Sequence, residues 1–157
     1  MARKAQRVGA KRHRFRVADF SGEYSFRFQG FGRRLAPGKN AFHLIGIGRL
    51  TLDGAGHLTG GQVSTICPIT GGMDGMDHGA FGSRRFDLVG TYSINSYGVG
   101  TVTIDFKFHG TVVNKDTFAV VATSNSGASF WLISTAPQTG GGAPVEELVS
   151  GEAIRLA

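Results

Sequence analysis

At 157 residues the chain has the length of one domain, and its single cysteine, Cys67, excludes an intrachain disulfide. Its 25 glycines and 12 phenylalanines, with only 4 prolines, favour an all-β domain over a disordered chain. The net charge of +6 is uneven, because residues 1–16 carry seven basic residues and no acid, whereas the rest of the chain sums to −1. No apolar run approaches the roughly 18 residues of a membrane-spanning helix, and no secretory signal is recognisable, so a cytoplasmic location is favoured.

We expect residues 1–19 to form a basic arm and residues 20–157 to form a single barrel domain. Basic arms often contact nucleic acid, and then through phosphates without regard to sequence. The alternatives are a solvated tail and a tail that packs along a neighbouring subunit, with Phe15 and Val17 as apolar anchors. Of the two roles that involve binding, we favour packing on a neighbouring subunit.

The first predicted strand covers residues 24–29, where Tyr24, Phe26 and Phe28 alternate with polar residues such as Arg27. A loop is predicted over residues 30–40, because three glycines, a proline and three basic residues gather there.

A second strand is predicted over residues 42–52, which are apolar or small on both faces, as in strands that are covered on both sides. With Leu44, Leu50 and Leu52 pointing inward, Ile45 and Ile47 lie outside and are predicted to contact another copy of the chain. The Asp-Gly turn that follows leads into a return strand over residues 57–69, with a bulge expected at its paired glycines.

A long glycine-rich loop is predicted over residues 70–85. Four strands follow at residues 86–94, 100–108, 117–124 and 129–135, and a fifth at residues 146–156, whose start also fits a short helix. The total is eight strands with no convincing amphipathic helix. We therefore predict an all-β, eight-stranded antiparallel meander that closes into an up-and-down barrel.

The interior of this barrel is the first candidate for ligand binding, and the residues expected to line it are large and mostly aromatic. They are Tyr24, Phe26, Phe28, Leu50, Phe86, Leu88, Tyr92, Phe106 and Trp131. The segments 46–53 and 98–105 share the pattern Gly-x-Gly-x-apolar-Thr-apolar-Asp, so two related halves and convergent hairpins both remain open.

Arg27, Arg49 and Glu152 are the polar candidates on the predicted strands. Because the first and last strands of a closed barrel are neighbours, Arg27 and Glu152 are expected to approach each other. An inward pair would mark a binding site for a polar group, whereas an outward pair would be an ordinary surface ion pair. We favour the outward arrangement.

Motifs for known chemistry are mostly missing. A dinucleotide fingerprint is rejected because Thr51 stands where the third glycine belongs. Asp74, Asp77 and His78 are of types that bind divalent metals, but an acidic surface loop is the preferred interpretation, so neither a metal nor a cofactor is predicted. Cys67 is interpreted as a buried small residue rather than a nucleophile.

Five short motifs carry a resemblance to known proteins: Gly-x-Tyr-x-Phe-x-Phe-x-Gly-Phe (22–31), Leu-Thr-x-Asp-Gly-x-Gly-x-Leu-Thr-Gly (50–60), Gly-Thr-Tyr-Ser-Ile (90–94), Phe-Trp-Leu-Ile (130–133) and Ser-Gly-Glu-Ala (150–153). With them the chain resembles small bacterial β-barrel proteins of unknown function, similar in architecture to calycins and allene oxide cyclase barrels. The resemblance implies a calycin-like barrel over residues 20–157 and carries no catalytic residue across.

Three functions fit these features: a barrel that binds a small apolar molecule without catalysis, an enzyme of the cyclase or isomerase type, and an oligomeric structural or interaction protein. A hollow apolar barrel would favour the first, and a hollow barrel with inward polar groups the second. A filled interior would favour the third.

Overall fold

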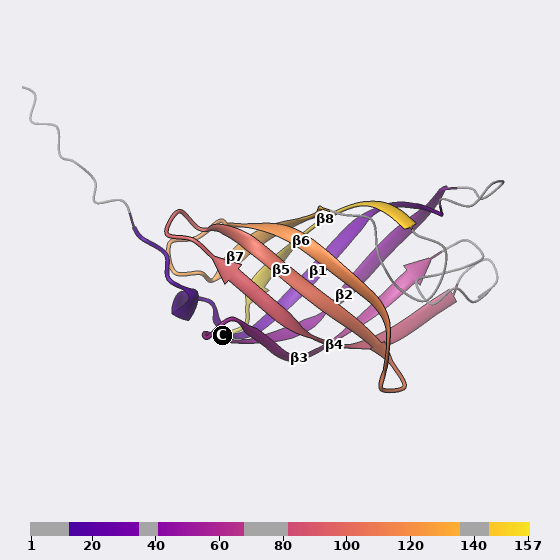
Figure 1. Cartoon of the computed structure of the whole chain (residues 1–157), viewed down its shortest axis with the longest axis horizontal. Helices are drawn as coiled ribbons and strands as arrows, with labels where there is room; N and C mark the ends of the chain where they lie inside the picture. The colour runs from indigo at the N-terminus through magenta and orange to yellow at the C-terminus, as the bar shows by residue number, and fades with distance from the viewer. Residues whose placement is uncertain (1–12, 35–40, 68–81, 136–144) are drawn as a thin grey trace, which may run out of the picture.

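A computed structural model describes residues 13–34, 41–67, 82–135 and 145–157. Eight antiparallel strands close into a barrel in which each strand pairs with the next and the last pairs with the first, so the predicted fold class is confirmed (Figure 1). A short 3₁₀ helix, η1 (Val17–Asp19), precedes the barrel. The strands are β1 (Ser21–Arg34), β2 (Ala41–Asp53), β3 (His57–Cys67), β4 (Gly82–Ile94), β5 (Val99–Phe108), β6 (Thr111–Ala122), β7 (Ser129–Ser134) and β8 (Val145–Arg155).

Several predicted boundaries are wrong. Strand β4 begins at Gly82, inside the predicted loop over residues 70–85. Strand β1 continues to Arg34 through the start of the predicted loop, because its backbone stays paired with both β2 and β8. Strand β6 begins at Thr111 rather than at residue 117, directly after a turn in which His109 and Gly110 adopt positive φ. The alternative of a short helix at the start of β8 is also wrong, since residues from Val145 onward are strand.

The bulge expected at the paired glycines of β3 is confirmed by shifts in register on both sides of that strand.

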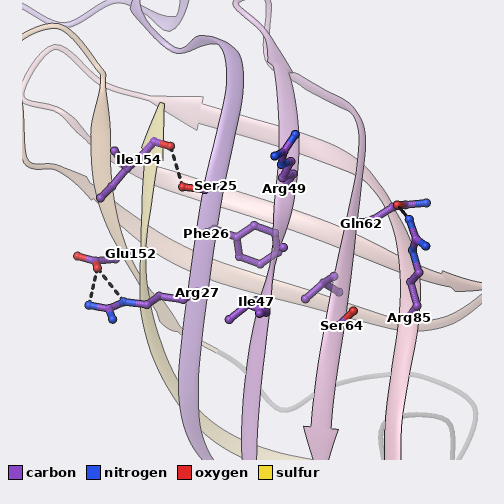
Figure 2. A pocket seen from close by; sticks show the side chains of 12 residues that line it. Ser25, Phe26, Arg27, Ile47, Arg49, Gln62, Ser64, Arg85, Glu152 and Ile154 are labelled. Atoms are coloured by element: carbon purple, nitrogen blue, oxygen red, sulfur yellow. Dashed lines mark hydrogen bonds and ion pairs between the residues drawn. The ribbon is translucent and has the colours of Figure 1, made fainter. Parts of the chain in front are cut away.

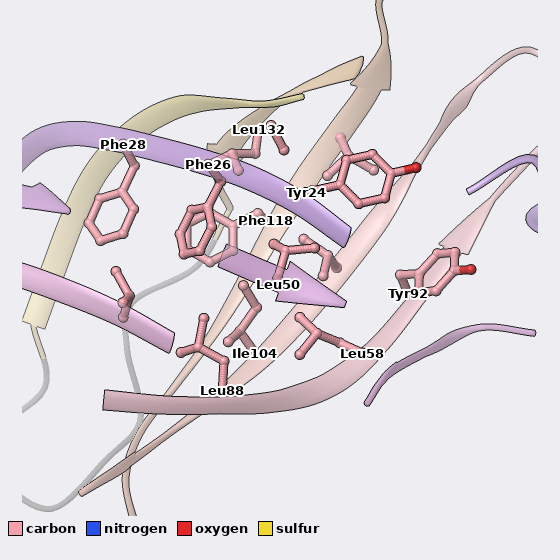
Figure 3. Close-up of a cluster of buried hydrophobic side chains, with 14 of the residues drawn as sticks. Tyr24, Phe26, Phe28, Leu50, Leu58, Leu88, Tyr92, Ile104, Phe118 and Leu132 are labelled. Atoms are coloured by element: carbon pink, nitrogen blue, oxygen red, sulfur yellow. The ribbon is translucent and has the colours of Figure 1, made fainter. Parts of the chain in front are cut away.

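Large side chains fill the inside of the barrel (Figure 3). Eight of the nine residues expected to line the interior are buried: Tyr24, Phe26, Phe28, Leu50, Phe86, Leu88, Tyr92 and Phe106. Their rings pack on one another, with centroids 6.1 Å apart for Phe26 and Phe28 and 6.2 Å apart for Phe86 and Phe106.

Trp131 is the exception, since 64% of it is exposed on the outer face. The inward positions of β7 are held by Phe130 and Leu132, and successive residues of a strand point to opposite faces. The prediction that Trp131 belongs to the interior is therefore wrong.

Two core rings lie against glycines of neighbouring strands. Phe28 pairs with Gly46 on one side and with Gly151 on the other, and Phe26 pairs with Gly48. A Cβ atom added to Gly48 would lie only 2.9 Å from the Phe26 ring, so a side chain there has no room. The missing side chains let β2 and β8 approach the core rings closely, which is a usual role of glycine in small barrels.

Residues 13–20 close one end of the barrel, the end at which the C-terminus also lies (Figure 1). The Tyr92 hydroxyl donates a hydrogen bond of 2.7 Å to the Phe20 carbonyl, and the Phe15 backbone N–H donates one of 3.2 Å to the Ser96 carbonyl. Phe15 and Val17 pack against this chain's own core. They were expected to anchor the arm on a neighbouring subunit, and this contact assigns them a different role.

No helix in the described part of the chain is long and apolar enough to cross a membrane.

Candidate functional site

The outer surface of five adjacent strands, β7, β8, β1, β2 and β3, carries large apolar side chains that water reaches. We call the following five residues, with their exposed fractions, the outer apolar face: Ile45 (45%), Ile47 (63%), Ile66 (47%), Trp131 (64%) and Ile133 (46%). Ile45 and Ile47 point outward, as expected.

Strand register places these side chains in two neighbouring rows. Trp131 is level with Glu152, then with Arg27, then with Ile47 across four strands. Two residues further along the strands, Ile133 is level with Ile45 and Ile66. In the second row Ser150 and Gln29 lie between Ile133 and Ile45, so the apolar side chains form two groups separated by polar residues of β8 and β1. Large exposed apolar side chains gathered on one side of a molecule are candidates for an interaction site.

A third row continues the apolar surface, where Leu148 pairs with Phe31, and these are 67% and 58% exposed. The Phe31 ring packs on His43 with centroids 4.3 Å apart.

An ion pair interrupts the first row, between Trp131 and Ile47. The Arg27 guanidinium donates from Nε to Oε1 of Glu152 at 2.8 Å, and Nη2 forms an ion pair with the same oxygen at 2.7 Å. The Arg27 side chain is 74% exposed and that of Glu152 is 33% exposed, so the expected outward arrangement is present. Both charges of the pair are therefore satisfied on the face itself.

Two depressions hollow this surface, each beside an inward-facing glycine. One, of about 500 Å³, lies between Trp131 and Ile47 and is bordered by Gly151. The other, of about 600 Å³, lies along β1, β2 and β3 and is bordered by Gly48, with Phe26 and Val63 of the core in its lining (Figure 2). Because the glycines carry no side chain, the strands sink toward the core at these places and the outer surface becomes concave.

Arg49 lies in the larger depression, level with Ser25 on β1 and with Gln62 on β3. The amide of Gln62 is fixed by two neighbours, since Arg85 donates to its Oε1 and its Nε2 donates to Asp87 at 3.0 Å. Figure 2 shows Arg27 directed toward Glu152 and Arg85 toward Gln62. Within the described residues, the Arg49 guanidinium has neither a hydrogen bond nor an ion pair.

Three buried polar residues inside the barrel were missed by the sequence analysis: Thr65, Asn114 and Asp116. Asn114 donates a hydrogen bond of 3.3 Å from Nδ2 to Asp116, which has a further interaction besides this one. The available signal was the continuation of the β6 alternation toward residue 111, where polar residues hold inward positions. The interior is therefore not purely apolar.

A carboxyl with a clearly lowered pKa, that of Asp53, lies in the β2–β3 turn rather than in either depression. Oδ1 of Asp53 accepts the backbone N–H groups of His57 and Ala55, at 2.9 and 2.7 Å. These bonds, with that of His57 having the larger effect, lower the pKa of Asp53 from 3.8 to about 2. Oδ2 also lies 2.7 Å from Nδ1 of the His57 ring. This arrangement stabilises the turn.

The described residues contain no group of three side chains able to hold a metal ion. The cluster considered for that role, Asp74, Asp77 and His78, lies outside the described residues, as does the side chain of Cys67.

Comparisons with known proteins add little. No protein-family model matches the chain, and no curated protein matches its sequence. Its structure is similar to that of a redesigned beta barrel, with 11% sequence identity and a TM-score of 0.45, over 90% of this chain and 95% of the other. This likeness is too weak to carry an argument about function, and a relation to calycins or allene oxide cyclases is not shown.

Proposed function

We propose that this protein is an interaction protein whose barrels associate with one another through the outer apolar face. The observation that carries the proposal is the placement of large apolar side chains in adjoining rows on the outside of five consecutive strands. Association would remove this surface from water, and the hydrophobic effect supplies the driving force.

The packed interior supports this function over the two that need a cavity. The rings of Phe26, Phe28 and their neighbours occupy the inside of the barrel. The inward tyrosines are used by the fold, since the hydroxyls of Tyr24 and Tyr92 donate to backbone carbonyls, each at 2.7 Å. Burial also raises the pKa of both hydroxyls, so neither is suited to act as a base. A ligand or substrate in the part of the interior that these described side chains occupy would have to displace them.

A second copy of the chain is the partner that fits the face best. The face presents protruding side chains, Trp131 and Ile47, beside the hollow bordered by Gly151, and a symmetric contact between copies requires both on the same surface. Tryptophan and arginine are also enriched at the centres of protein interfaces. Because Arg27 and Glu152 already neutralise each other, docking would not bury an unpaired charge at this point.

Sedimentation velocity at high micromolar concentration tests the proposal. The intact protein should sediment as a multiple of its 16.6 kDa chain, and Ile47→Lys should shift it to the monomer, because it places a charge in the contact. Val112→Lys is the matched control, since Val112 is apolar and 47% exposed but lies on β6, outside the face. A wild-type protein that stays monomeric, or equal effects of both substitutions, would rule the proposal out.

A further inference from the structure

We infer that the depression around Arg49 is a binding site for a small molecule in which a carboxylate is attached to an apolar chain. This inference goes beyond the proposed association and does not depend on it. It rests on three features of the depression: a guanidinium without a partner among the described residues, an apolar floor, and a size of about 600 Å³, which suits a small ligand.

The charge of the depression favours an anion. Its lining holds three guanidinium groups, those of Arg27, Arg49 and Arg85, against a single carboxylate, that of Glu152. Glu152 is already bound by Arg27, and Arg85 donates to Gln62. Of these three arginines, Arg49 is the one without a hydrogen bond or ion pair to any residue that the structure describes, and a guanidinium binds a carboxylate through two parallel hydrogen bonds.

The neighbours of Arg49 would orient such a ligand. Ser25 and Gln62 lie level with Arg49 on the two adjacent strands, and Ser64 also lines the depression. The Ser25 hydroxyl makes only a long bond of 3.4 Å to the Ile154 carbonyl, so it is available to a stronger acceptor. The Gln62 amide is held in place between Arg85 and Asp87, so its orientation is fixed before a ligand binds.

The apolar part of the ligand would lie on the floor beside the guanidinium. Gly48 has no side chain to cover the core at this point, and Phe26 and Val63 therefore contribute to the lining. Ile47 and Ile154 add apolar walls and are 63% and 50% exposed. Burial of an alkyl chain against these groups would supply the binding energy that a single exposed ion pair lacks.

Octanoate is a suitable probe, with acetate, inorganic phosphate and octanol as comparisons. Titration of the isotope-labelled protein, followed by amide chemical shifts, should show octanoate binding with shifts centred on the strands around Arg49. Arg49→Gln should weaken octanoate binding about tenfold, the change expected for loss of one charge-assisted hydrogen bond. Arg14→Gln removes the same charge from an exposed site outside the depression and should leave binding unchanged.

Equal binding of octanol or acetate would overturn the inference, because the ligand would then need only one of its two parts. Equal binding of inorganic phosphate would overturn it for the same reason, and so would an unchanged affinity in Arg49→Gln. The titration should be repeated on Ile133→Lys, which alters the outer apolar face without touching the depression. Octanoate binding that persists in this variant supports a site within one chain, even if association itself is never observed. Loss of binding there would contradict it.

Discussion

The ring of Phe28 occupies the space that a side chain on Gly46 would need, across the β1–β2 pair. Phe28 also pairs with Gly151 on β8, so the residues level with it on both neighbouring strands have no side chain. Gly151 and Phe28 both line the smaller depression of the outer face.

Gly46→Ala should therefore destabilise the barrel by about 1–3 kcal/mol, the usual cost of overpacking a filled core. Urea denaturation monitored by circular dichroism gives this free energy of unfolding. Gly60→Ala is the matched control, because an added Cβ at Gly60 would meet nothing within 4 Å. If both substitutions have the same small effect, the contact between Phe28 and Gly46 does not constrain the fold.

Stability in acid should depend on Asp53. Its pKa is about 2 in the folded protein against an ordinary value of 3.8, so the folded state binds this proton less tightly than the unfolded chain. The stabilisation is therefore complete above about pH 4 and is lost as the pH falls toward 2. In Asp53→Asn, which keeps an acceptor for the backbone N–H groups, the loss of stability over this pH range should be smaller. Identical pH dependence of the two unfolding free energies would refute the assignment.

The ion pair between Arg27 and Glu152 should contribute little to folding. Arg27 is 74% exposed, and exposed ion pairs are worth less than about 1 kcal/mol. Glu152→Gln should change the unfolding free energy by no more than that, and the change should shrink further in high salt. If denaturant titration shows a larger loss of unfolding free energy that does not depend on salt, the ion pair contributes more to stability than its exposure indicates.

Two truncations should distinguish the role of the first twelve residues from that of residues 13–19, which lie against the barrel. Removing residues 1–12 deletes five of the seven basic residues of the N-terminus and should leave the thermal midpoint unchanged. Any affinity for duplex DNA at low salt should then fall, because such binding rests on phosphate contacts. Removing residues 1–19 also removes Phe15 and Val17 from the core surface and should cost about 2 kcal/mol. Equal melting temperatures of the two truncated proteins would contradict the role given to residues 13–19.

The sequence predicted the barrel well where its hydrophobic alternation is unambiguous. In β5, apolar residues alternate with threonine, aspartate and lysine, so only one face can be buried. In β7, Phe130 to Ile133 are all apolar, and alternation cannot decide which of them point inward. Trp131 was misplaced for this reason.

The recurring sequence motif predicted local structure less well than the alternation of apolar and polar residues did. Gly46-x-Gly48 and Gly98-x-Gly100 share one pattern, but Gly46 lies within β2, whereas Gly98 has a φ of 80° in the turn before β5. The outer hollows could not be predicted either, since they depend on which ring lies opposite each glycine across the strands. The buried Asn114 and Asp116 were missed because hydropathy favours apolar residues at inward positions.

The central claim, that copies of the barrel associate through the outer apolar face, is tested most directly by the fluorescence of Trp131. It is the only tryptophan of the chain and is 64% exposed in the single barrel. As protein concentration rises from low to high micromolar, its emission should shift to shorter wavelength and its quenching by acrylamide should decrease, since the partner copy covers the indole. Emission and quenching that stay those of an exposed tryptophan at every concentration would contradict the account.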